Sequence, residues 1–223
     1  MRAMSDPSTR YLGFAFASAD LLLEIDADDR VGFVVGAVQR ALGRGEGAVV
    51  GRPWRDLVAE NDHPLVAAVL ESLQSGGRRG PVRIGLAGAA EGRTVAFSAC
   101  RLPHNEGRTS CALSLAPGLA LLPGGKDDHG LLDPEAFVDA TGRLLEAAGR
   151  SGLDLGVQFV ELKGLTEAEQ AASPERRKSL LGRISAALRA ESYAGDGAAR
   201  VGEDRFVLVR EGSDDPKALL GRL

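Results

Sequence analysis

The chain has 223 residues, 44% of them hydrophobic and 26% charged, which is typical of a globular protein with one large or two small domains. The formal net charge of −4 gives no basic footprint of the kind that binds nucleic acid, so we expect no nucleic-acid partner. No apolar run approaches the ~20 residues that cross a bilayer, and residues 1–10 are too polar for a secretory signal. The sequence therefore predicts a cytoplasmic protein with no membrane partner.

Strand signals open and close the first half of the chain. Apolar runs at 20–25 and 31–35 flank an Asp-rich turn, and residues 11–19 before them form a candidate flanking helix that is apolar on one side. Glycine-punctuated segments of predicted short helices follow up to Leu57. Asp62 then caps a longer helix whose first turn contains Pro64. Further strands are predicted at 82–86, 94–102 and 109–115, so this half is α+β with an antiparallel sheet.

Helices and strands alternate differently in the second half. Asp133 and Pro134 begin one helix, and Ser173 and Pro174 begin another. The apolar run at 153–162 between them is suited to a central strand. Residues 198–201 and 206–209 flank a polar turn and predict a hairpin, and a last helix is predicted to begin near Asp214.

The first half resembles PAS domains. The resemblance rests on Glu24-Ile-Asp26 with its Asp-rich turn, on Val50-Gly-Arg-Pro53, on Asn61-Asp62 leading into the helix, and on the three closing strands. It implies a five-stranded antiparallel sheet with flanking helices and an interior that holds a small ligand of unknown identity or is a plain hydrophobic core. The residues that would line such a pocket are Leu23, Ile25, Phe33, Val35, Trp54, Val69, Ile84, Phe97 and Leu113.

The first half gives little sign of a known PAS cofactor. PAS relatives hold haem through a helix histidine, but His63 lies beside a helix cap and a proline, where a surface position is expected. The Asn-Cys-Arg-Phe-Leu motif of flavin-binding relatives is missing. Cys100 and Cys111 fall in predicted strands and are expected to be free core thiols in a reducing compartment. Trp54 either lines the pocket or packs a short helix against the sheet. No two histidines have metal-ligand spacing, so neither cofactor nor metal is predicted.

The second half resembles GGDEF domains, which make cyclic di-GMP from GTP. His129 to Asp133 corresponds to the entry motif Thr-Gly-Leu-x-Asn, and Phe159 to Lys163 to the strand Phe-x-Asp-x-Asp. Ala199 to Phe206 stands where the family has Ala-Arg-Tyr-Gly-Gly-Asp-Glu-Phe. The family's domain continues well beyond this hairpin, so the sequence is expected to be a shortened relative or part of a longer protein.

The residues for cyclase chemistry are largely replaced. Phosphoryl transfer of this kind needs carboxylates that hold two metal ions, whereas arginine can neither bind Mg²⁺ nor act as a base. The guanine-reading positions fall at Glu169 and near Lys178. The degenerate site comprises the hairpin residues Gly202, Glu203, Asp204, Arg205 and Phe206, the strand residues Glu161 and Lys163, and Tyr193 and Asp196 of the inhibitory product site, whose phosphate-gripping Arg is missing.

These resemblances imply a bacterial, non-catalytic signalling module. Its expected parts are an N-terminal extension with flanking helix (1–19), a PAS-like sensor (20–117), a linker (118–128) and a degenerate partial GGDEF-like domain (129–223). We expect a homodimer and an EAL or other output domain in cis or in trans. Two alternatives remain open: a GTP-binding regulator of a downstream EAL phosphodiesterase, and a residual diguanylate cyclase that uses Glu161 and Asp204.

Overall fold

A computed structural model describes residues 7–90, 92–103, 107–115, 125–151 and 153–212. The chain divides into two compact units, one comprising Met1–His63 and Leu73–Gly118, the other Pro64–Ser72 and Leu119–Leu223. Most of the predicted linker, the helix predicted near Asp214, and His104 lie outside the described residues.

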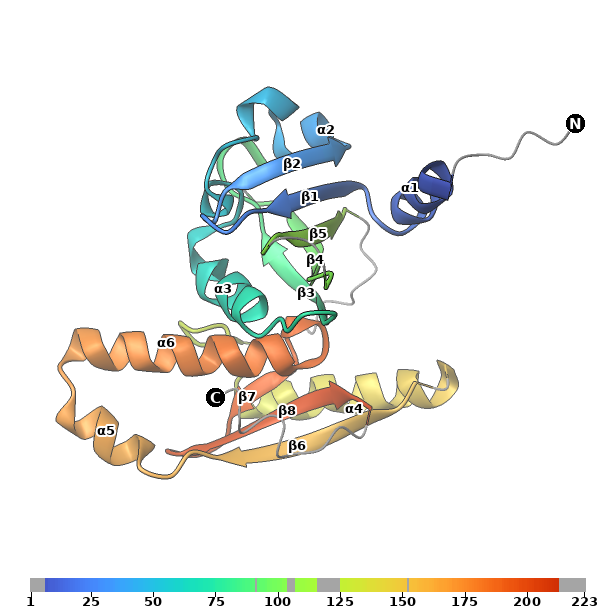
Figure 1. The fold of residues 1–223 in the computed structure, drawn as a ribbon. Helices are drawn as coiled ribbons and strands as arrows, with labels where there is room; N and C mark the ends of the chain where they lie inside the picture. Colours follow the sequence, from blue (N-terminus) through green and yellow to red (C-terminus); the bar gives the residue numbers. More distant parts are fainter. Residues whose placement is uncertain (1–6, 91, 104–106, 116–124, 152, 213–223) are drawn as a thin grey trace, which may run out of the picture. The chain divides into compact units, whose positions relative to one another are not determined.

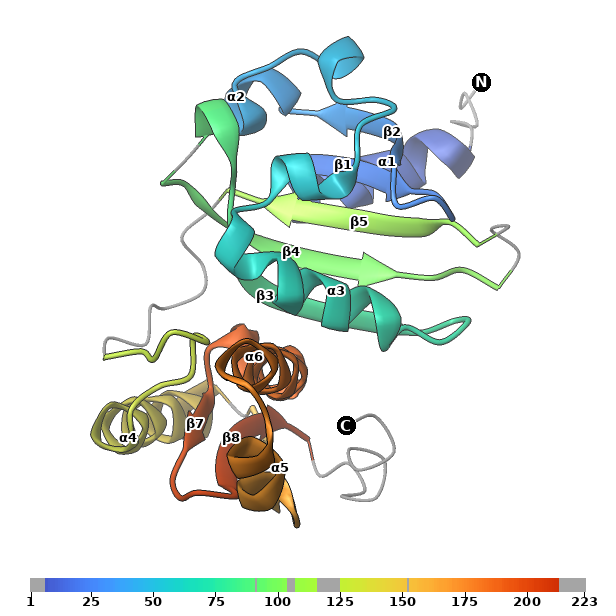
Figure 2. The same ribbon diagram turned by 90° about the vertical axis from the view of Figure 1, so that its left-hand side faces the viewer.

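The first unit is built on a five-stranded antiparallel sheet in the order β2-β1-β5-β4-β3 (Figures 1 and 2). All five strands were predicted, although the third begins earlier in the chain than its apolar pattern suggested. The α+β class with an antiparallel sheet is therefore confirmed for this unit. The strands are β1 (Leu21–Ile25), β2 (Val31–Gly36), β3 (Arg78–Gly85), β4 (Thr94–Cys100) and β5 (Thr109–Ser114).

Short helical segments connect the strands of this unit. The predicted flanking helix is α1 (Pro7–Ser18), and α2 (Val38–Leu42) ends at Gly43, whose left-handed backbone suits glycine. The Asp-rich turn forms as expected, because Asp26 Oδ1 accepts hydrogen bonds from the backbone N–H groups of Asp28 and Arg30. Single 3₁₀ turns occur at Glu46–Ala48, Trp54–Leu57, Glu60–Asp62 and Gly88–Ala90.

The longer helix predicted from Asp62 is α3 (His63–Glu71). Its buried residues are Leu65, Val66 and Val69, which belong to the predicted apolar stripe. Asp62 Oδ2 accepts a hydrogen bond from the backbone N–H of Gly85 at 2.7 Å, so this carboxylate also ties the start of the helix to the end of β3.

One strand of the sheet turns a predicted pocket residue the other way. Pairing between β1 and β2 shifts register after Glu24, which pairs with Phe33, whereas Ile25 pairs with Val31. The extra residue, Gly32, reverses the alternation of side chains. Val31 and Val34 are buried, while Phe33 is 50% exposed. The prediction that Phe33 lines the interior was therefore wrong, since apolar alternation does not reveal a bulge.

The second unit has a three-stranded antiparallel sheet in the order β6-β8-β7. Asp133 caps the first helix as predicted, because its Oδ1 accepts the backbone N–H of Ala136 at 2.8 Å. Ser173 Oγ likewise accepts the N–H of Arg176. The elements are α4 (Pro134–Ser151), β6 (Leu155–Glu161), α5 (Leu165–Ala171), α6 (Pro174–Glu191), a 3₁₀ turn at Tyr193–Gly195, β7 (Ala198–Arg200) and β8 (Arg205–Glu211).

Both faces of this sheet carry apolar side chains, because β8 is buried on both sides. Phe206 and Leu208 belong to a cluster with Leu188 of α6. Val207 and Val209 belong to a second cluster with residues of α4. Successive side chains of a strand point to opposite faces, so α6 and α4 cover opposite faces of the sheet, as Figure 2 shows.

Within the described residues β6 lies at an edge of this sheet, not at its centre. Its apolar run made a central strand the natural prediction, which was wrong for this part of the chain. Val157 is 42% and Phe159 75% exposed. An apolar run shows what a strand could bury, but not whether a neighbouring strand is present.

No helix in the described part of the chain is both long and apolar enough to cross a membrane.

Candidate functional site

The tip of the β7–β8 hairpin brings the predicted GGDEF-like residues together. The N–H groups of Val201 and Gly202 both point to the carbonyl oxygen of Arg205, which closes the turn. The N–H of Leu162 donates to the carbonyl oxygen of Asp204 at 2.9 Å. Because β6 pairs with β8, Glu161 stands directly opposite Arg205. The strand and hairpin motifs, far apart in the sequence, therefore meet at one end of the sheet.

A guanidinium group lies between the two acids at this tip. Arg205 Nη2 is 3.6 Å from Glu161 Oε1, and Arg205 Nε is 4.0 Å from Asp204 Oδ1. The Arg205 side chain is 67% exposed, so each ion pair is weak. The guanidinium nevertheless offsets the negative charge that would attract a divalent cation. Lys163, two residues beyond Glu161, is exposed and adds a second positive charge near the end of the strand.

A second arginine, Arg200, makes several contacts with the hairpin turn. Arg200 forms a two-pronged ion pair with Glu169 of α5, at 3.0 Å and 3.1 Å between nitrogen and oxygen atoms. It also donates to the carbonyl oxygens of Gly202 and Glu203 and lies over the Phe206 ring. Both carboxylate oxygens of Glu169 are thus already bonded. A guanine base, which this position reads in the resemblance, would have to share these oxygens with Arg200 or displace it.

The remaining predicted nucleotide positions do not converge on the tip. Asp196 is buried and pairs with Lys126 Nζ at 2.7 Å, so its carboxylate serves an internal ion pair. Tyr193 is half-buried against the α4 cluster. Lys178 is exposed on α6.

The predicted interior pocket of the first unit is occupied by core side chains. Trp54 is 2% exposed, and its Nε1 has no hydrogen-bond partner in the described structure. Its ring meets His63 edge-on, with 5.7 Å between ring centroids. Val35 is only half-buried. The other predicted residues of this unit that the structure buries are Leu23, Ile25, Ile84, Phe97 and Leu113, and Val69 of α3 is buried as well.

His63 is held by main-chain groups. Its Nε2 lies 3.0 Å from the carbonyl oxygen of Arg55 and 2.9 Å from that of Val58, so this nitrogen carries the proton and donates. The half-buried ring is therefore a structural donor instead of the surface group that we expected.

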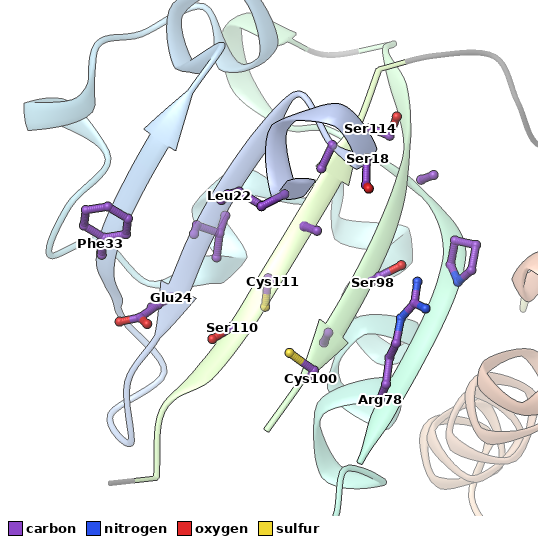
Figure 3. Close-up of a pocket in the computed structure, with 17 residues that line it drawn as sticks. Ser18, Leu22, Glu24, Phe33, Arg78, Ser98, Cys100, Ser110, Cys111 and Ser114 are labelled. Carbon is purple, nitrogen blue, oxygen red and sulfur yellow. The ribbon is translucent and has the colours of Figure 1, made fainter. Parts of the chain in front are cut away.

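A groove of about 530 Å³ lies on the opposite face of the five-stranded sheet. Figure 3 shows its floor, made by side chains of β1, β5 and β4, with Phe33 and Glu24 at one end and Arg78 at the other. Ala15, Ser18 and Ala19 line it from α1 and the turn that follows. This groove was not predicted from the sequence. Its signal was the run of small residues in alternate positions of β4 and β5, which leaves a hollow where larger side chains would stand.

The two thiols beside the groove differ in burial. Both cysteines are free, with Cys111 buried and Cys100 half-buried. Desolvation by burial raises the pKa of the Cys111 thiol far above its ordinary value, and nearby Cys100 and Glu24 raise it further. Cys111 therefore stays protonated and unreactive, as expected of a core thiol, whereas Cys100 is more accessible than predicted.

Among the described residues, no cluster of three or more His, Cys, Asp or Glu side chains could hold a metal ion. No known protein family and no curated protein matches the chain.

Solved structures similar to this chain include sensory domains. A domain of a sensory-box sensor histidine kinase/response regulator from Geobacter sulfurreducens is 21% identical, with 48% of this chain and 92% of that one covered and a TM-score of 0.39. The PAS domain of an HTR-like protein from Haloarcula marismortui is 20% identical, with 48% of this chain and 88% of that one covered and a TM-score of 0.39. The dark structure of the blue-light photoreceptor Aureochrome1 LOV is 13% identical, with 66% and 98% covered and a TM-score of 0.40. The first two matches span about half of this chain.

Proposed function

We propose that the chain is a non-catalytic signal-transduction module of the cyclic di-GMP type. In this proposal a PAS-like sensor at 20–117 passes its state to a degenerate GGDEF-like domain at 129–223. The support for the second part is the common register of three sequence motifs, together with a β6–β8 pairing that sets Glu161 beside the hairpin turn. The support for the first is the order of PAS-like motifs on a five-stranded antiparallel sheet.

The observation that carries the non-catalytic assignment is the position of Arg205. Its guanidinium lies beside Glu161 and Asp204, the two acids left at the expected metal site. A permanently charged group there opposes the binding of divalent ions, without which GTP cannot be aligned for attack. We propose that the unit acts through contacts, as a homodimer or on an EAL or other output domain in cis or in trans.

The proposal is tested by incubating the purified protein with GTP and either Mg²⁺ or Mn²⁺ and measuring cyclic di-GMP by mass spectrometry. We expect no product above the level of a protein-free control. Product formed by the wild-type protein and lost in a Glu161→Ala variant would overturn the proposal and establish the residual cyclase. Product that survives in Glu161→Ala would come from a contaminating enzyme, and the proposal would stand.

The other alternative, a regulator that binds GTP without turning it over, predicts heat on titration with GTP and Mg²⁺. The ion pair between Arg200 and Glu169 argues against it, because a guanine base would have to compete with Arg200 for this carboxylate. We expect calorimetry to show no saturable GTP binding.

A further inference from the structure

The groove on the outer face of the five-stranded sheet has the dimensions of a ligand site. Its volume, about 530 Å³, falls in the range of pockets that bind small molecules, which are mostly apolar with a few placed polar groups. Leu22, Ala96 and Ala112 are among the apolar residues of its lining. The side chains on this face come from alternate positions of the strands and point away from the buried core.

Charge within the groove is unbalanced. Glu24 at one end is paired with Arg108, with 3.7 Å between Oε2 and Nη1. Arg78 at the other end has no hydrogen-bond or ion-pair partner among the described residues and is exposed. Among the described residues of the lining, Glu24 is the one anion and is offset by Arg108, whereas the one cation, Arg78, is not offset. The unpaired charge of the groove is positive, so the groove favours an anionic ligand.

Unused hydrogen-bonding groups lie on the path between the two ends. Strand pairing places Arg78 of β3 opposite Cys100 of β4, and Cys100 opposite Ser110 of β5. Ser110 in turn pairs with Glu24 of β1. The hydroxyl groups of Ser98 and Ser110 line the groove and bond to no described group. In Figure 3 the Arg78 side chain extends toward Ser98. Arg78 and Ser98 together can hold both oxygens of a carboxylate.

We propose that this groove binds a small organic carboxylate with an apolar tail. The carboxylate pairs with the Arg78 guanidinium and accepts a hydrogen bond from Ser98 Oγ, and the tail lies over Ala112 toward Leu22. The two charged ends are three strand spacings apart, about 14 Å, so the tail can extend across the floor without meeting Glu24. The site lies entirely in the first unit and does not depend on whether the second unit is catalytic.

Octanoate is the probe, and octan-1-ol and octylammonium are its controls for charge. Calorimetry and thermal unfolding on the full chain should show octanoate binding most tightly, octan-1-ol more weakly and octylammonium weakest. Arg78→Gln should weaken octanoate binding about tenfold or more and leave octan-1-ol unchanged. Arg176→Gln, which changes an exposed arginine of α6, should leave both unchanged.

A second variant tests the position of the tail. Ala112→Phe fills the floor with a residue that strands accept well, and should abolish binding of octanoate and octan-1-ol alike while far-UV circular dichroism stays unchanged. If this variant unfolds, Ser98→Leu provides the same block from β4.

Several results would overturn the proposal. These are the absence of saturable octanoate binding, octylammonium binding as tight as that of octanoate, and normal octanoate binding by Arg78→Gln. A second copy could instead cover the groove through exposed Phe33. In that case the wild type would sediment as a dimer, Ala112→Phe as a monomer, and octanoate would not bind.

Discussion

Arginines behave differently in the two units, and the difference separates a binding site from a structural contact. At the hairpin tip of the second unit, Arg200 and Arg205 both face carboxylates of the same chain. On the outer sheet face of the first unit, Arg78 faces small hydroxyl and methyl groups and has no described partner. The charge of an arginine that is paired within the fold is already partly neutralised. An unpaired arginine beside an apolar groove can still pair with an anionic ligand.

The two ion pairs at the hairpin also differ from each other. Arg200 and Glu169 are 28% and 16% exposed and meet through two nitrogen–oxygen contacts, whereas Arg205 and Glu161 are 67% and 47% exposed and meet through one. Water screens the second pair and largely leaves the first alone. The first should therefore hold the hairpin in place, while the second mainly sets the local charge.

The largest expected effect is the loss of the half-buried pair between Arg200 and Glu169. Glu169→Ala leaves the Arg200 guanidinium half-desolvated with only the turn carbonyls as acceptors, and should lower the free energy of unfolding by about 2 kcal/mol. Urea unfolding followed by far-UV circular dichroism measures this. Glu167→Ala, on the same helix but exposed, is the matched control and should change it by less than about 0.5 kcal/mol. Equal losses in the two variants would show that α5 itself, and not the pair, is being disrupted.

A smaller effect concerns the thiol beneath the groove. The pKa of Cys111 is raised in the folded protein, so above pH 9.0, where a free thiol ionises, the unfolded chain releases a proton that the folded chain keeps. Stability is unaffected below that pH and falls above it, by about 1.4 kcal/mol for one pH unit.

The measurement for this thiol compares the wild type with Cys111→Val. Urea unfolding at pH 8 and at about pH 10, followed by the fluorescence of the single tryptophan, Trp54, should show a larger loss in the wild type than in the variant. An equal loss in both proteins would mean that Cys111 ionises normally in the folded state.

The sequence predicted helices, strands and caps well, but it predicted poorly which residues from other parts of the chain lie beside them. The five strands of the first unit, the caps at Asp133 and Ser173, and the β7–β8 hairpin follow from apolar spacing and from residues that bond their own backbone. These signals are local, and so they survive without knowledge of the fold. The meeting of Glu161 with Arg205 was also foreseeable, but only through a resemblance that aligned two distant motifs.

What could not be predicted depends on neighbours. Phe33 faces outward because Gly32 forms a β-bulge, and the alternation of apolar residues does not predict a bulge. The role of Glu169 depends on Arg200, which lies 31 positions away in the sequence. The groove exists because small residues on adjacent strands come into register, which the sequence of a single strand cannot reveal.

The smallest effect is expected at the hairpin tip itself. Arg205→Ala removes an exposed guanidinium that lies 3.6 Å from Glu161, and should change the free energy of unfolding by less than about 1 kcal/mol. Urea unfolding at low and at high salt measures it, and the difference from the wild type should shrink as salt screens the pair. A loss as large as that of Glu169→Ala would place Arg205 among the structural contacts, and the contrast between the two pairs would no longer hold. With the predicted small loss, Arg205 mainly contributes charge to the surface, where carboxylates of the chain already lie beside it, whereas Arg78 has no such described partner.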